Sequence, residues 1–248
     1  MIFDDSEAGR GQADFIDVPI MAYRRAQVLQ GRCAAARIDG RLGRDVLMLL
    51  EHPPVFTLGR HGGLENLTVS EGHLTEKGID VVQSERGGNI TYHGPGQLVG
   101  YPIMDLEARR LSVKDYVKAL ETVLIETAAG QNVQAERNPK NAGAWVGNTK
   151  LGSIGICLRR GVAFHGIALN VNNDLTPFSW VNPCGLRGVS MTSIRKETGA
   201  PADMESVRKT LKSVFSKVFN TRLSPMSITE LEARLDQPRK ERLDRRSP

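Results

Sequence analysis

The chain has 248 residues, of which 40% are hydrophobic and 25% are charged, and its formal net charge is +5. These values are ordinary for a globular protein, so they exclude collagen-like, coiled-coil and largely disordered chains. There is no run of 18 apolar residues, so we expect no membrane span. The three cysteines form no CxxC pair, and such a sparse, odd set favours reduced thiols in a cytoplasmic protein.

Length and composition favour a single domain. Residues 1–14 carry early acidic residues and no apolar stretch, so we interpret them as a flexible N-terminal extension. Residues 236–248 are strongly basic and are interpreted as a flexible tail. The folded domain is then expected over 15–235. The basic balance leaves a nucleic acid, an anionic membrane or an acidic protein open as a partner.

The first half of the chain predicts one helix and several strands. Apolar positions at helical spacing predict a helix over 20–37. The nearly continuous apolar run 45–52 predicts a buried strand, which Pro53 and Pro54 end. Short extended segments are expected at 55–59 and 79–83.

Residues 86–102 are rich in glycine but also contain residues typical of strands. Gly94-Pro95-Gly96-Gln97 fits a type II turn, in which the third residue needs a positive φ. We therefore predict a strand–turn–strand hairpin. The glycine spacing fits neither a dinucleotide-binding loop nor a P-loop. Glycines here would let a ligand lie close to the main chain, although a tightly packed turn without a ligand is the alternative.

The second half predicts three helices and three strands. Ser112 is a candidate N-cap and Gly130 a terminator for the first helix, and Ser227 with Glu230 forms a capping box for the last. The helices are expected over 113–129, 204–219 and 228–235, and the extended segments over 144–146, 151–158 and 162–171. Strands and helices interleave without a regular βαβ order. This predicts an α/β (α+β) domain with a mixed β-sheet flanked by helices.

Cysteine chemistry is the first candidate function. Cys157 lies in an alternating strand pattern and Cys33 in a helix, so both are expected to be core residues. Cys184 lies between Pro183 and Gly185, which predict an exposed loop. A thiol there is a candidate nucleophile, and an inert loop cysteine is the alternative.

A cysteine nucleophile needs a neighbouring cation or base, because few thiols are ionised near neutral pH. Lys150 lies in a turn that enters a strand and is one candidate, although most lysines only solvate a surface. His93 and His165 are the conventional alternatives. The five histidines show no metal-binding spacing, so we expect neither a metal nor another cofactor.

Five segments together resemble the lipoyl(octanoyl) transferases. They occur in the order of that family, they fall within residues 17–219, and any one alone would be a weak signal. The segments are EHPPVFTLGR (51–60), RGGNITYHGPGQLVGYPI (86–103), KLGSIGI (150–156), FHGIALNV (164–171) and NPCGL (182–186).

The resemblance implies a fold shared with biotin and lipoate protein ligases. Apart from the resemblance, we expect the chain to be a monomer. The resemblance also implies transfer of octanoyl from acyl carrier protein to a lysine of apo-lipoyl domains, in 2-oxo-acid dehydrogenases and the glycine cleavage H protein, as the first step of protein lipoylation. The family's nucleophile matches Cys184 and its acid/base matches Lys150. Its acyl-binding residues match Arg86, Gly87, Gly88, Asn89, Ile90, Thr91, Tyr92, His93, Ser153, Ile154, Gly155, Gly166, Ile167 and Ala168.

Two other functions remain open on the sequence. An ATP-dependent lipoate protein ligase would need no cysteine nucleophile. A non-catalytic basic module could bind nucleic acid, although 13 aromatic residues without basic–aromatic interleaving count against a nucleic-acid partner. For a transferase, Arg60, Arg86 and the basic surface would attract acidic carrier and lipoyl domains.

Overall fold

The computed structural model describes residues 11–139, 141–181 and 190–238. Its main sheet has the strand order β10-β8-β9-β6-β2-β1-β11, and β7 pairs with β8 beside this path. The sheet is mixed, since β1 runs parallel to β2 and β11 whereas β6 is antiparallel to β2 and β9. Its strands are β1 (Gly11–Ile20), β2 (Asp45–Glu51), β6 (Gln97–Asp105), β7 (Gly143–Val146), β8 (Thr149–Arg159), β9 (Val162–Asn170), β10 (Ser190–Met191) and β11 (Thr221–Pro225).

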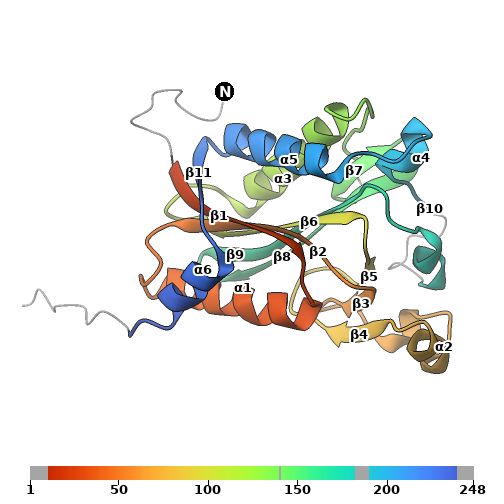
Figure 1. Ribbon diagram of the computed structural model, residues 1–248, viewed down its shortest axis with the longest axis horizontal. Helices are drawn as coiled ribbons and strands as arrows, with labels where there is room; N and C mark the ends of the chain where they lie inside the picture. The colour runs from red at the N-terminus through yellow and green to blue at the C-terminus, as the bar shows by residue number, and fades with distance from the viewer. Residues whose placement is uncertain (1–10, 140, 182–189, 239–248) are drawn as a thin grey trace, which may run out of the picture.

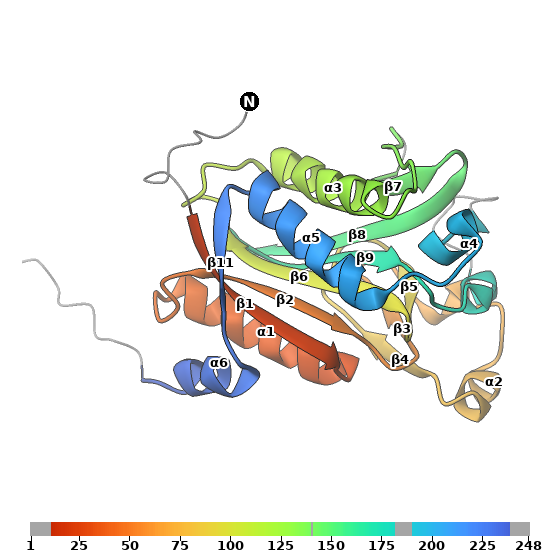
Figure 2. The same ribbon diagram turned by 45° about the horizontal axis from the view of Figure 1, so that its top comes forward.

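Helices cover both faces of the main sheet (Figures 1 and 2). On one face lie α3 (Val113–Ala129) and α5 (Met204–Val218), and on the other lie α1 (Tyr23–Ile38) and α6 (Ile228–Leu235). In β2, Leu47 and Leu49 join the core beneath α3 and α5, while Val46 and Met48 join the core beneath α1. Burial on both faces explains the continuous apolar run, and the predicted helix-flanked mixed sheet is confirmed.

A second, three-stranded sheet lies at one end of the molecule (Figure 1). It consists of β4 (Asp80–Gln83), β3 (Val55–Leu58) and β5 (Ile90–His93), and β3 is the central strand. A short helix α2 (Glu71–Glu76) and a 3-10 helix η3 (Thr176–Trp180) accompany it. Its own small core includes Phe56, Leu74 and Tyr92.

The predicted hairpin over 86–102 is wrong in its pairing, although its turn is confirmed. Gly96 has φ +84°, and the Gln97 N–H donates to the Gly94 carbonyl at 3.1 Å. The strands on either side of the turn enter different sheets, because β5 pairs with β3 and β6 pairs with β2 and β9. The turn therefore joins the two sheets.

The expected N-terminal extension is too long, because β1 begins at Gly11. This strand lies between β2 and β11 in the main sheet. Asp14, expected in the extension, is 2% exposed, and its carboxylate accepts a hydrogen bond from Arg234 at 3.1 Å. Sequence patterns missed β1 and β11 because the buried Asp14 interrupts the apolar pattern of β1, and because Thr221 is the one buried residue of β11.

The three helices predicted in the second half of the chain are confirmed closely, as Val113–Ala129, Met204–Val218 and Ile228–Leu235. The Ser112 hydroxyl accepts from the Asp115 N–H to cap α3, and Ser227 with Glu230 forms the capping box of α6. The first predicted helix starts at Tyr23 rather than at residue 20, since β1 continues to Ile20. Among the residues described, no helix is both long and apolar enough to cross a membrane. The short helix α4 (Ile194–Thr198) follows β10.

Candidate acyl-binding site

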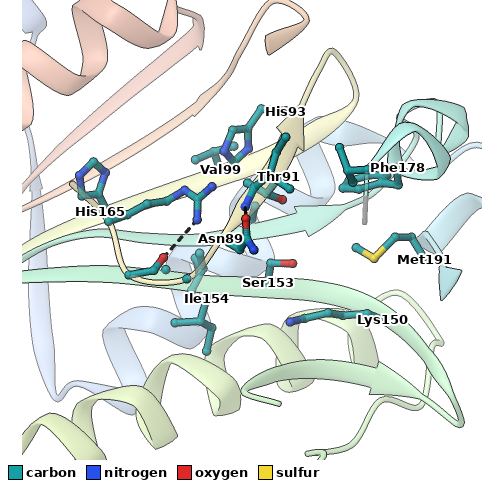
Figure 3. A pocket seen from close by; sticks show the side chains of 18 of the residues that line it. Asn89, Thr91, His93, Val99, Lys150, Ser153, Ile154, His165, Phe178 and Met191 are labelled. Carbon is teal, nitrogen blue, oxygen red and sulfur yellow. Dashed lines mark hydrogen bonds between the residues drawn. The ribbon is translucent and has the colours of Figure 1, made fainter. Parts of the chain in front are cut away.

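A pocket of about 580 Å³ lies where the second sheet meets β8 and β9 (Figure 3). Its volume is within the range of about 300–1,000 Å³ that is usual for small-molecule sites. Apolar side chains form much of the wall, and they come from β6, β8, β9, the stretch 175–181 and β10: Val99, Ile154, Ile167, Ala168, Leu175, Phe178, Val181 and Met191. The lining suits a mainly apolar ligand.

The segment that begins at Arg86 crosses over β8 and forms one side of the pocket. The Gly87 N–H donates to the Ile156 carbonyl at 2.8 Å. A Cβ atom on Gly155 would lie 3.3 Å from the Gly87 carbonyl oxygen and 3.2 Å from Cδ of Arg86. Because this is tighter than most real Cβ contacts, a glycine at 155 lets the segment approach the strand.

Arg86 is buried at 8% exposure and holds its segment against β3. Its Nη2 donates to the Thr57 carbonyl at 2.6 Å, and its Nε donates to the Thr57 hydroxyl at 3.0 Å. The expectation that Arg86 belongs to an exposed basic surface is therefore wrong, whereas Arg60 is exposed. The charge of Arg86 therefore lies within the pocket wall.

The structure brings together most of the residues expected to bind the acyl group. Thirteen of the fourteen line the pocket: Arg86, Gly87, Gly88, Asn89, Ile90, Thr91, His93, Ser153, Ile154, Gly155, Gly166, Ile167 and Ala168. The exception is Tyr92, whose neighbours Thr91 and His93 both line the pocket. Its ring packs instead against Phe56 and Phe178 in the core of the second sheet. Alternation of side chains along β5 explains this placement.

Lys150 lines the pocket near its Met191 side, at one end of the cavity (Figure 3). Its Nζ donates a short hydrogen bond to Oδ1 of Asn141 and lies 5.4 Å from the ring centroid of Trp145. Burial lowers the pKa of Lys150 from 10.5 to about 8, while the carboxylate of Glu121 acts in the opposite direction. A lysine in this state can donate and accept a proton near neutral pH.

The two candidate histidines lie away from Lys150 (Figure 3). His165 pairs with Ile156 across β8 and β9, and Ile156 is six residues along β8 from Lys150, or about 20 Å. Burial lowers the pKa of His165 to about 3 and takes that of His93 well below its usual range. Both rings are therefore neutral at physiological pH. His93 is held by a hydrogen bond between its Nδ1 and the Gln97 side chain at 2.7 Å.

Two of the three cysteines are core residues, as expected. Cys33 and Cys157 are 0% and 4% exposed. Burial raises the pKa of Cys33 to about 12 and also raises that of Cys157. The expected nucleophile, Cys184, lies outside the described residues. The described residues on either side of its segment, Val181 and Ser190, both line the pocket.

Several lining residues were missed by the sequence analysis. Asn141 lies on the connection between α3 and β7, and Tyr23 and Tyr101 come from α1 and β6. Leu175 and Phe178 come from the η3 region. Nothing local in the sequence marks these residues, because only the assembled fold brings their elements to one pocket.

The sequence matches the lipoyl protein ligase A/B catalytic domain family over residues 23–216. An octanoyltransferase of Desulfotalea psychrophila is 50% identical over 206 residues, which cover 82% of this chain and 92% of that protein. An octanoyltransferase of Syntrophobacter fumaroxidans is 40% identical over 225 residues, which cover 91% and 98%.

Solved structures are similar in fold at low sequence identity. The bi-partite lipoate protein ligase of Thermoplasma acidophilum superposes with a TM-score of 0.66 at 17% identity, covering 91% of this chain and 90% of that one. A biotin protein ligase of Aquifex aeolicus gives a TM-score of 0.52 at 11% identity, covering 83% and 70%. The expected ligase-like fold is thus confirmed, and the chain belongs to the octanoyltransferases, acyltransferases within the lipoyl protein ligase A/B catalytic domain family.

Proposed function

We propose that this chain transfers octanoyl from acyl carrier protein to a lysine of apo-lipoyl domains, through a thioester on Cys184 and with Lys150 as acid and base. The observation that carries the proposal is the pocket itself. It gathers three of the motif segments around an apolar cavity and places a lysine with a lowered pKa at one end. Acyl binding and proton transfer then occur in one site.

Chain connectivity supports the participation of Cys184. It follows the pocket-lining residue Val181 by three positions, a stretch of at most about 11 Å. Ser190, beyond the segment, pairs with Thr149 beside Lys150. The thiols of Cys33 and Cys157 are buried, and their raised pKa values make them poor nucleophiles.

In the first half-reaction, the positive charge of Lys150 favours the Cys184 thiolate. The thiolate attacks the carbonyl carbon of the carrier thioester, and the carrier leaves as a thiolate that takes a proton from Lys150. The products are the octanoyl-enzyme, the free carrier thiol and a neutral Lys150. Loss of the cysteine anion also removes a charge that favoured protonated Lys150.

In the second half-reaction, the amine of the acceptor lysine attacks the octanoyl-enzyme. Neutral Lys150 takes the proton that this amine loses, and Cys184 leaves as a thiolate beside the ammonium that forms. The amide product carries the octanoyl group, and the enzyme returns to its starting state. A lysine whose pKa is about 8 can serve both half-reactions at neutral pH.

The proposed partners are those that the family resemblance implies. Octanoyl-acyl carrier protein is the donor, and apo-lipoyl domains of 2-oxo-acid dehydrogenases and the glycine cleavage H protein are the acceptors. We place the reaction in the cytoplasm and the working enzyme as a monomer. The similarity to octanoyltransferases supports the identity of the acyl group, and the pocket's apolar lining supports its binding.

Intact-mass spectrometry after incubation with octanoyl-acyl carrier protein tests the proposal. Wild type and the control Cys157→Ala should each gain one octanoyl group, and Cys184→Ala should gain none. Lys150→Ala should be acylated slowly and should not pass the group to a lipoyl domain. An octanoyl adduct on Cys184→Ala would contradict the scheme. ATP-dependent attachment of lipoate to a lipoyl domain by Cys184→Ala would instead favour the ligase alternative.

A further inference from the structure

We infer that Asn141 is a positioning residue for Lys150, one that fixes the amine at the pocket wall through its side-chain oxygen. This inference rests on the role proposed above for Lys150. Oδ1 of Asn141 accepts a hydrogen bond from Nζ of Lys150, and both residues line the pocket. An amide oxygen can only accept, so it orients the amine in either protonation state.

The backbone of Asn141 is itself held in place. Its carbonyl accepts from Nε1 of Trp145 at 3.0 Å, and its N–H donates to the Asn138 carbonyl at 3.3 Å. Trp145 is 3% exposed, and its backbone exchanges two hydrogen bonds with Glu136, at 2.7 and 2.9 Å. The connection between α3 and β7 is therefore closed on itself, with Asn141 near its tip and directed at Lys150.

A buried carboxylate ties the same connection to α3. Oε1 of Glu121 accepts from the Gly143 N–H at 3.1 Å, and Oε2 accepts from Nε of Arg137 at 3.1 Å. Glu121 is 7% exposed. It thus anchors residues on both sides of Asn141, and its field also reaches Lys150. Because both oxygens are engaged, Glu121 supplies charge and an anchor while Asn141 supplies the direct contact.

Among the described residues, the groups that face Lys150 come from three elements. Glu121 on α3 is negatively charged, with Arg137 paired to it, whereas Trp145 on β7 and Met191 on β10 carry no charge. A hydrogen bond to a charged donor is stronger than one to a neutral donor. Asn141 therefore stabilises the ammonium more than the amine and offsets part of the burial that lowers the pKa of Lys150.

Opposite effects are expected from two substitutions. Asn141→Ala removes the acceptor, so the pKa of Lys150 should fall by about one pH unit. Asn141→Asp keeps the shape but adds a negative charge, so the pKa should rise by about one unit or more. A residue with a purely structural role would not move the titration in two directions. Gln134→Ala is the matched control, because Gln134 is an exposed amide on the same connection.

The experiment follows the ¹³C chemical shift of Cε of Lys150 against pH in the full-length protein, with the signal assigned by its loss in Lys150→Met. In parallel, the pH profile of the first acylation by octanoyl-acyl carrier protein is measured. We expect the midpoint of the Cε titration and the basic limb of the acylation profile to move to lower pH in Asn141→Ala and to higher pH in Asn141→Asp. Neither should move in Gln134→Ala. Unchanged midpoints, or two shifts in the same direction, would overturn the inference. If Lys150→Met still completed the transfer, the proposed role of Lys150 would fail instead.

Discussion

Replacing Lys150 by methionine should stabilise the fold while it stops turnover. Methionine keeps an unbranched side chain, one heavy atom shorter than that of lysine, and carries no charge to remove from water. The folded pKa of about 8 lies about 2.5 pH units below the ordinary value of 10.5. At about 1.36 kcal/mol per unit this corresponds to about 3.4 kcal/mol of unfavourable charge burial. Because Lys150 is only partly buried and methionine also loses the hydrogen bond to Asn141, the expected gain is reduced to about 1–2 kcal/mol.

The pH dependence gives this prediction its sign. Below about pH 8 the lysine is charged in both the folded and the unfolded chain, so the wild type bears the full cost. Between about pH 8 and 10.5 the unfolded chain binds more protons, and the stability of the wild type rises with pH relative to the methionine variant. The advantage of Lys150→Met should therefore be largest at neutral pH and should disappear by about pH 10.5.

Urea unfolding at pH 7 and pH 10 measures the difference, and Lys209→Met is the control. The side chain of Lys209 is 75% exposed on α5, so its replacement should change the free energy of unfolding by less than about 0.5 kcal/mol at either pH. The reasoning would be refuted if Lys150→Met were less stable than wild type at pH 7. It would also be refuted if the difference in free energy of unfolding between the variant and wild type were the same at both pH values.

Two other substitutions separate the pocket from the scaffold. Ala168→Val adds two carbons to the pocket wall, so the ratio of octanoyl to hexanoyl transfer should fall by roughly four-fold for each methylene displaced. Competition between the two carrier thioesters measures this ratio, and the exposed control Ala129→Val should not alter it. Asp45→Asn should cost about 3–5 kcal/mol in urea unfolding, because Asp45 is 3% exposed and pairs with Arg37 and Arg109 at 3.1 and 2.8 Å. The control is Asp236→Asn, because the exposed carboxylate of Asp236 pairs with Arg32, and this change should cost less than about 1 kcal/mol. A similar cost for both substitutions would contradict the role of burial.

Local signals in the sequence predicted local structure well. The Ser112 cap and the apolar period predict the helix over 113–129, and both signals depend only on residues close together in the sequence. The Gly94–Gln97 turn was also found, since the positive φ of Gly96 is a property of one residue. Strand pairing is different, because β5 pairs with β3, and β6 pairs with β2 and β9, across long stretches of chain. No pattern within 86–102 encodes that choice.

The site shows the same division between local and assembled features. The motif segments were identified by resemblance, and strand alternation then decided that Thr91 and His93 line the pocket while Tyr92 does not. Lys150 could be named as a candidate from the sequence, but its lowered pKa depends on burial by the assembled fold. Asn141 carried no signal at all, because it reaches Lys150 only after its connection closes against Trp145.

Burial lowers the pKa of three ionisable groups of this pocket, with two different consequences. It lowers the pKa of His93 and His165 away from neutral pH, so these rings contribute no charge deep in the cavity. It lowers the pKa of Lys150 toward neutral pH, so this amine can change charge during a reaction. A single physical cause therefore gives neutral imidazoles in one part of the pocket and a titrating amine at the other end. The separation depends on β8, which carries Lys150 at one end and pairs with His165 near the other.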